Sequence, residues 1–147
     1  MNSRRTFLAG ALSVAVLPCA AEATPDSMAE AIKAVTRGAA LQPVRIKLDI
    51  PPLVENGNAV PLTVTVESPM SEADHVRAIH VFNEKNPQPH VFKAWLSPRN
   101  GRATISTRIK LADAQKVVAI AETSKGVFFT ASAEVIVTIA ACIEDIT

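Results

Sequence analysis

Val44-Arg-Ile-Lys-Leu-Asp-Ile50 and Val60-Pro-Leu-Thr-Val-Thr-Val66 decide the fold, because apolar and polar residues alternate strictly in both stretches. Side chains of a β-strand point to opposite faces in turn, so this period of two predicts strands with one buried face. The segment between them, Pro51-Pro-Leu-Val-Glu-Asn-Gly-Asn58, contains prolines and an Asn-Gly pair, which are typical of turns.

The same strand pattern continues toward the C-terminus, interrupted by segments rich in Pro, Asn and Gly. Roughly seven short strands at this spacing predict an all-β fold, an antiparallel β-sandwich, with a small barrel as the alternative. The further strands are expected at residues 75–82, 91–96, 102–109, 116–122, 127–132 and 134–140.

A short amphipathic helix is expected before the first strand, at residues 25–38. Ser27 and Glu30 have the spacing of a capping box, apolar residues recur at helical spacing, and Gly38 can end the helix. We expect this helix to pack against the body of the domain.

The first residues have the order of an export signal. Arg4 and Arg5 precede an apolar run of about 11 residues, shorter than the roughly 20 that a membrane-spanning helix needs. Ser3-Arg-Arg-Thr-Phe-Leu8 resembles the twin-arginine signal, and Ala21-Glu-Ala23 fits a cleavage site. We therefore expect residues 1–23 to be a signal peptide without a permanent membrane anchor, and residues 24–147 to be one mature domain in the periplasm.

The expected mature domain carries no net charge, since it holds 13 basic and 13 acidic residues. Binding of nucleic acid relies on a clustered basic surface, whereas the Lys and Arg residues here are dispersed. Nucleic acid is therefore not an expected partner.

The sequence offers little for catalysis or metal binding. Three histidines, His75, His80 and His90, are possible metal ligands. However, the expected mature domain offers only one cysteine and no carboxylate cluster at metal-binding spacing to complete such a site. We expect His80 on the strand face opposite Ile79 and Val81, and the other two histidines near strand ends in contact with water. No nucleophile elbow or phosphate-binding loop is present. The sequence thus predicts no catalytic residue, metal or cofactor, and the aromatic residues are expected in the core: Phe82, Phe92, Trp95, Phe128 and Phe129.

Cys142 is the one cysteine that remains if Cys19 is removed with the signal. A single cysteine in an exported protein indicates a reactive thiol or an intermolecular bond. If Val135, Val137 and Ile139 face inward, parity places Cys142 on the outer face. The chain from Ile139 to Cys142 can extend at most roughly 10 Å, so the thiol could project beyond the domain edge.

Three stretches of the chain form a recognisable set. They are Leu48-Asp-Ile-Pro-Pro-Leu-Val-Glu-Asn-Gly-Asn-Ala-Val-Pro61 with Ser68-Pro-Met70, Ala78-Ile-His-Val-Phe-Asn-Glu-Lys-Asn-Pro87, and Ser106-Thr-Arg-Ile-Lys-Leu111 running on to Ala131-Ser-Ala-Glu-Val-Ile-Val-Thr-Ile139. Together they resemble the SoxY family of thiosulfate-oxidation carrier proteins. The resemblance implies an immunoglobulin-like sandwich that pairs with a SoxZ-like subunit. It also implies that Cys142, on a C-terminal arm, carries sulfur intermediates. A haem protein would load this thiol oxidatively and other enzymes would act on the bound group.

The arm departs from the family pattern of Gly-Gly-Cys-Gly. Here Ala140 and Ala141 precede the cysteine, and Ile143 and Glu144 follow it. Replacing glycine by these residues narrows the backbone conformations, so we expect a stiffer and bulkier arm. Glu144, Asp145 and the terminal carboxylate disfavour ionisation of the thiol and repel anions.

Two functions of different classes remain open at this point. In the first, the protein is a sulfur carrier that other enzymes act on. In the second, it is a divergent paralogue that docks a SoxZ-like partner and carries nothing. A third possibility is that Cys142 only forms an intermolecular disulfide.

Overall fold

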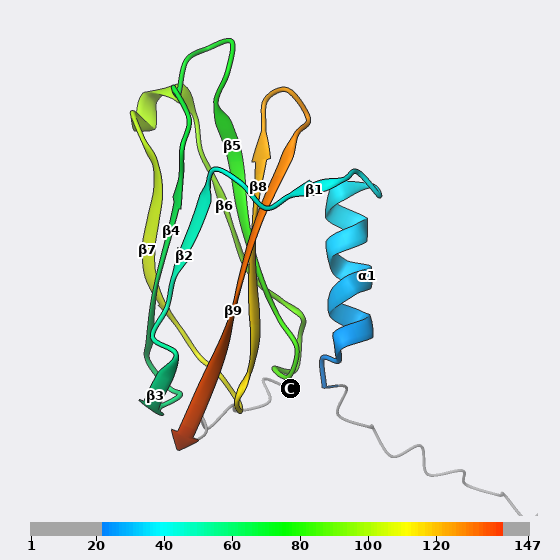
Figure 1. The fold of residues 1–147 in the computed structure, drawn as a ribbon, viewed down its shortest axis with the longest axis vertical. Coiled ribbons are helices and arrows are strands. Elements are labelled where there is room, and N and C mark those ends of the chain that lie inside the picture. Colours follow the sequence, from blue (N-terminus) through cyan, green and yellow to red (C-terminus); the bar gives the residue numbers. More distant parts are fainter. Residues whose placement is uncertain (1–21, 140–147) are drawn as a thin grey trace, which may run out of the picture.

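Two β-sheets packed face to face form the body of the protein, and one helix covers the outer face of the larger sheet (Figure 1). The computed structural model describes residues 22–139. The larger sheet has the order β1-β9-β8-β5-β6 with β3 paired to β9, and the smaller has the order β2-β4-β7. The elements are α1 (Pro25–Thr36), β1 (Leu41–Gln42), β2 (Ile46–Asp49), β3 (Leu53–Asn56), β4 (Val60–Val66), β5 (Val76–Asn83), β6 (His90–Trp95), a 3₁₀ turn (Pro98–Asn100), β7 (Ala103–Ile109), β8 (Gln115–Thr123) and β9 (Phe128–Ile139).

The main core lies between the two sheets, as the alternating sequence predicts. In β4, Val60, Leu62, Val64 and Val66 are buried, while the residues between them are exposed or half-buried. Strands β5 and β8 are buried almost throughout, because their other face lies under α1. This confirms the predicted antiparallel sandwich of the immunoglobulin-like kind and removes the barrel alternative.

The helix packs on the sheet and begins at Pro25 as expected, but it ends at Thr36 and is capped by another residue than predicted. Met28 packs with Phe82 and Phe128 in a second apolar cluster outside the main core. Thr24 is the N-cap: its side-chain oxygen accepts a hydrogen bond from the Ser27 N–H, and the Thr24 N–H donates to the Ser27 hydroxyl oxygen. The predicted box of Ser27 and Glu30 was therefore one turn too late. The described residues contain no helix with the length and apolar character to cross a membrane.

Strands β3 and β9 differ from the sequence prediction. The segment containing β3 was predicted as a turn, yet Leu53–Asn56 pairs in parallel with β9. The predicted strands at 127–132 and 134–140 are one continuous strand of 12 residues. Figure 1 shows β9 crossing the whole height of the sandwich and ending beside β3. Both differences concern the end of the chain where the candidate site lies.

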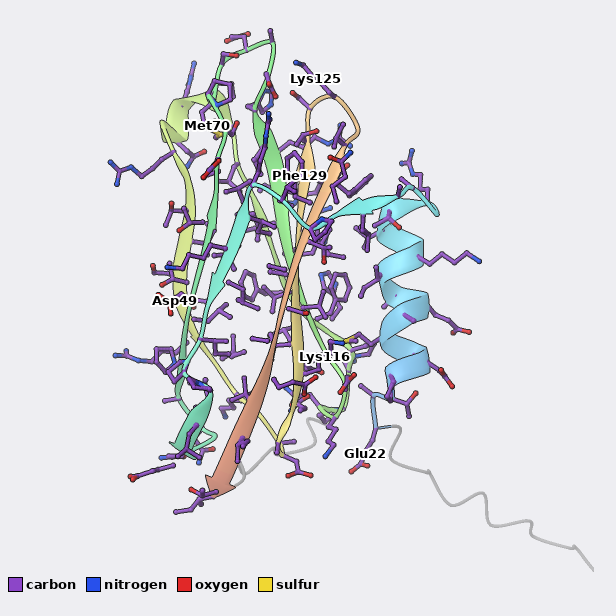
Figure 2. All side chains as sticks on the ribbon, viewed as in Figure 1. Glu22, Asp49, Met70, Lys116, Lys125 and Phe129 are labelled. Atoms are coloured by element: carbon purple, nitrogen blue, oxygen red, sulfur yellow. The ribbon has the colours of Figure 1, made fainter. Side chains whose placement is uncertain are left out.

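Trp95 was predicted in the core and is 69% exposed. It lies at the end of β6, the edge strand of the larger sheet, and the Lys93 Nζ is 3.4 Å from the centre of its ring. An ammonium group over an indole face stabilises such an exposed ring. Of the other aromatic residues, Phe82, Phe128 and Phe129 are buried, and Phe92 is half-buried against the core (Figure 2, where Phe129 is labelled).

Candidate functional site

The end of β9 is held by β3 through backbone hydrogen bonds. Leu53 lies opposite Ile136, and Asn56 lies opposite Ile139. The Ile136 N–H donates to the Pro52 carbonyl oxygen over 2.9 Å, and the Thr138 hydroxyl donates to the Glu55 carbonyl oxygen over 3.1 Å. The last described residue of the chain is therefore part of a paired strand.

Gly57 connects this strand pair to the rest of the domain. Its N–H donates to the carbonyl oxygen of Ile139 over 2.9 Å, and its own carbonyl oxygen accepts from the Leu111 N–H over 2.8 Å. Gly57 is buried, and the turn is stabilised where the Asn58 N–H donates to the Asn56 side-chain oxygen. This turn fixes the end of β9 to the connection between β7 and β8.

Asn86 holds the neighbouring loop at the same end of the sandwich. Its side-chain amide donates to the Lys110 carbonyl oxygen, and its side-chain oxygen accepts from the Ala112 N–H. The Gln115 side chain donates to the same oxygen over 3.0 Å. Two of the stretches that carry the family resemblance thus contribute turns that fix this end of the domain.

Large apolar side chains are exposed around the end of β9. Leu53, Ile136 and Ile139 are 58–66% exposed. Leu53 and Ile136 are paired and share one face, whereas alternation places Ile139 on the opposite face at the tip of β9. We call these three residues around the strand end the root patch. The predicted parity of β9 is correct where it can be followed: Val135 is buried, Val137 is half-buried, and Ile136 and Thr138 are exposed. Ile139, predicted to face inward, is exposed at the end of the strand.

The predicted covalent site and its flanks lie outside the described residues. These residues are Ala140, Ala141, Cys142, Ile143 and Glu144. The structure therefore describes the strand that leads to Cys142 and the contacts of that strand.

A second polar group lies on the helix-covered face of the larger sheet. His80 is 1% exposed and stacks against Phe82 and His90, with ring centres 6.1 and 5.5 Å apart. Both ring nitrogens of His80 lack a hydrogen-bond partner, and its Nε2 is 3.7 Å from a Glu122 carboxylate oxygen. His80 lies on the face opposite Ile79 and Val81, as predicted, but its side chain is buried there.

Burial is the main reason that the pKa of His80 falls from 6.5 to about 4, and the positive charges of Lys93 and His90 add to it. Glu122 opposes this shift, but weakly, because 3.7 Å exceeds hydrogen-bond length and Arg77 already donates to the same carboxylate over 3.0 Å. His80 is therefore neutral at pH 7. Within residues 22–139, no group of three or more His, Cys, Asp or Glu side chains is placed to hold a metal ion.

A family model described as "Sulfur oxidation protein SoxY" matches residues 32–142, so the match extends to Cys142. The chain belongs to the SoxY family. No curated protein matches this SoxY sequence closely. Among solved structures, the sulfur carrier protein SoxY from Chlorobium limicola f thiosulfatophilum is 27% identical, with a TM-score of 0.65 over 79% of this chain and 100% of that chain.

The SoxY fold is also similar to that of superoxide reductases. The neelaredoxin from Ignicoccus hospitalis is 20% identical, with a TM-score of 0.57 over 78% of this chain and 94% of that chain. A putative superoxide reductase from Thermotoga maritima is 21% identical, with a TM-score of 0.53 over 63% of this chain and 84% of that chain. At these identities the likeness concerns the sandwich fold alone.

Sequence reasoning missed β3 and Gly57 as residues of the site. The sequence signal for β3 is the apolar pair Leu53-Val54 inside the predicted turn. The predicted turn segment is long enough to contain one short strand. Its partner in β9 is more than 80 residues away in the sequence, and a parallel pair leaves no local signature.

Proposed function

We propose that this SoxY protein is a periplasmic sulfur-carrier subunit of a thiosulfate-oxidising system, and that Cys142 holds the sulfur intermediates covalently. The observation that carries the proposal is the fixed end of β9, where Ile139 bonds to Gly57 three residues before Cys142. A thiol this close to a fixed strand end stays near one edge of the domain. The related SoxY of Chlorobium is itself described as a sulfur carrier protein.

The loading step can be written for thiosulfate as the simplest cargo. The Cys142 S–H bond breaks and an S–S bond forms to the outer sulfur of thiosulfate, giving Cys–S–S–SO₃⁻, one proton and two electrons. A haem protein accepts the two electrons, and water accepts the proton. The thiolate is the reacting form of cysteine, so the loading enzyme has to promote ionisation of a thiol whose ordinary pKa is about 8.5.

In this role the protein is not an enzyme but a substrate that other enzymes act on. One covalent tether can present the same sulfur group to several active sites in turn. The proposed stable partner is a SoxZ-like subunit, with which the sandwich forms a heterodimer. Residues 1–23 are proposed to export the protein by the twin-arginine route, which transports folded substrates.

A second candidate function is a divergent interaction module that docks a SoxZ-like partner and carries no cargo. The arm sequence favours it, because Ala140, Ala141 and Ile143 stand where the family has glycine. A bulkier arm enters a narrow enzyme channel less readily.

Mass spectrometry of the protein from cells that are oxidising thiosulfate distinguishes the two functions. The carrier function predicts a sulfur adduct on the peptide containing Cys142, removed by a reductant. The Cys142→Ser variant should lose thiosulfate oxidation while retaining the SoxZ-like subunit. An unmodified Cys142, together with full oxidation by the variant, would contradict the carrier function and support the interaction module.

A further inference from the structure

The root patch is an unusual concentration of exposed apolar surface. Within residues 22–139, five large apolar side chains are strongly exposed, and three of them, Leu53, Ile136 and Ile139, form this patch. The pairing of Leu53 with Ile136 places two of them side by side on neighbouring strands. Exposed apolar patches on a soluble protein mark sites of interaction.

The reach of the chain limits where an enzyme that acts on Cys142 can stand. Cys142 follows Ile139 by three residues, a span of at most roughly 10 Å even when fully extended. Ile139 cannot move outward freely, because its carbonyl oxygen is bonded to Gly57. An enzyme that encloses the sulfur atom must therefore approach the domain within the width of one or two side chains. The surface it meets at the base of the arm is the root patch.

We propose that the root patch is the surface on which the sulfur-processing enzymes dock while they hold Cys142. This rests on the proposed carrier function. The occupant is the rim of an enzyme pocket with an apolar centre and flanking basic residues. The exposed carboxylates Glu55 and Glu134 lie beside the patch on β3 and β9, and Glu144 and Asp145 follow the cysteine. A basic rim complements these charges and suits a pocket that binds anionic sulfur groups.

The size of the patch indicates a transient contact. Three side chains that are 58–66% exposed offer on the order of 300 Å² around the strand end, and Leu53 with Ile136 forms the part on one face. Stable protein interfaces bury about 800 Å² on each partner, so this patch alone is too small for a permanent subunit or a second copy. A carrier that binds several enzymes in turn has to dissociate from each of them, which a small contact allows.

The hydrogen bonds of β3 hold the patch in place before any enzyme binds. Leu53 and Ile136 lie on strands joined by the Ile136 N–H bond to Pro52 and the Thr138 hydroxyl bond to Glu55. A preformed surface loses little conformational entropy on binding, which strengthens a small contact.

The test compares enzyme-catalysed and uncatalysed loading of Cys142. The test variant combines Leu53→Thr and Ile136→Thr, since threonine keeps the strand propensity of the exposed positions. The control is Val44→Thr, at another strongly exposed apolar residue, outside the patch and between β1 and β2. A second control, Leu53→Met with Ile136→Leu, keeps the patch apolar. If the double threonine variant does not fold, Ile136→Thr alone replaces it.

Each protein is loaded in two ways, and the adduct is measured by intact mass. Tetrathionate loads the thiol without an enzyme, releasing thiosulfate as the S–S bond exchanges. Thiosulfate with a periplasmic extract of thiosulfate-grown cells loads it enzymatically. The threonine variant should load about tenfold more slowly with the extract, which corresponds to about 1.4 kcal/mol, and at an unchanged rate with tetrathionate. Both controls should match the wild type in both reactions.

Three results would overturn the inference in distinguishable ways. Equal extract-catalysed rates for the threonine variant and the wild type would show that the patch is not a docking surface. Loss of the SoxZ-like subunit from the threonine variant on gel filtration would assign the patch to that subunit. A wild-type protein that takes tetrathionate but is never loaded by the extract would contradict the carrier function itself.

Discussion

The N–H of Gly57 donates a hydrogen bond of 2.9 Å to the carbonyl oxygen of Ile139, although the two residues are 82 positions apart in the sequence. This bond terminates the pairing of β3 with β9 at the point where the described chain ends. Through the Gly57 carbonyl oxygen the same residue is tied to Leu111. The position from which the C-terminal residues start is therefore set by a turn in the first half of the protein.

Val54→Ala should loosen this arrangement, whereas Leu53→Ala should not. Val54 is buried in the main core, and Leu53, next to it in β3, is exposed. Removing buried methyl groups costs about 2 kcal/mol here, and truncating an exposed side chain costs about 0.5 kcal/mol. Urea unfolding measures both costs, and hydrogen exchange of the Ile136 amide reports on the β3 pairing. Equal stability losses would contradict the role of Val54 as the anchor of β3.

The N-cap of α1 gives a second prediction, which separates the two possible capping boxes. Thr24→Ala should lower the free energy of unfolding by about 1 kcal/mol, because the Ser27 N–H loses its acceptor. Glu30→Ala should change stability little, since alanine is a good helix former and Glu30 has no role in the cap. Thermal unfolding of the chain from Glu22 onward measures both. A larger effect at Glu30 would favour the box expected from the sequence.

The strict alternation in β2 and β4 made the sandwich predictable, since period-two burial is a local property of the strand. The helix was predictable from its apolar spacing, but its capping residue was not, because both Thr24 and Ser27 are good caps. Leu53–Asn56 looked like a turn because prolines precede it and a glycine follows it. Its strand conformation depends on β9, which supplies the hydrogen bonds from a distant part of the sequence.

Exposure at sheet edges was the other property that the sequence did not reveal. Trp95 is apolar enough for a core, but β6 has a neighbour on one side only, and Lys93 covers the ring. His80 differs from its expected exposure in the opposite direction. Strand alternation places it on the outer face of the sheet, and the packing of α1 and neighbouring side chains buries it there. The candidate site divides in the same way, since Cys142 was predicted from cysteine counting and the family resemblance, whereas the root patch depends on long-range pairing.

His80 predicts a loss of stability in acid. Its pKa is about 4 in the folded protein and 6.5 when unfolded, so the unfolded chain binds more protons between these values. Stability is therefore retained above pH 6.5 and is lost as the pH falls toward 4, by about 2.5 kcal/mol at pH 4.5.

Urea unfolding at pH 7 and pH 4.5 measures this loss, and the His80→Phe variant is the comparison. Phenylalanine keeps a ring beside Phe82 and His90 and cannot take up a proton. The difference in stability between the two pH values should be smaller in this variant by about 2.5 kcal/mol. If both proteins lose the same stability, other groups are responsible, and the acid form of His80 is accommodated without cost.

The charges after Cys142 predict which reagents its thiol prefers. Glu144 and Asp145 lie within three residues of Cys142, so they repel an anionic disulfide reagent. They change the rate of a neutral reagent only through their effect on the ionisation of the thiol. Raising the ionic strength from 0.01 to 1 M shortens the screening length from about 30 to 3 Å. The rate with the anionic reagent should therefore rise with salt by several-fold, while the rate with the neutral reagent changes little.

Stopped-flow measurements with 5,5′-dithiobis(2-nitrobenzoate) and 4,4′-dithiodipyridine make this comparison. Glu144→Gln with Asp145→Asn should raise the low-salt rate of the anionic reagent and remove most of its salt dependence. Glu134→Gln is a matched control on β9, eight residues before the cysteine. If the double variant keeps the salt dependence of the wild type, repulsion comes from the folded domain and not from the arm. The acidic residues would then have no direct part in selecting the cargo.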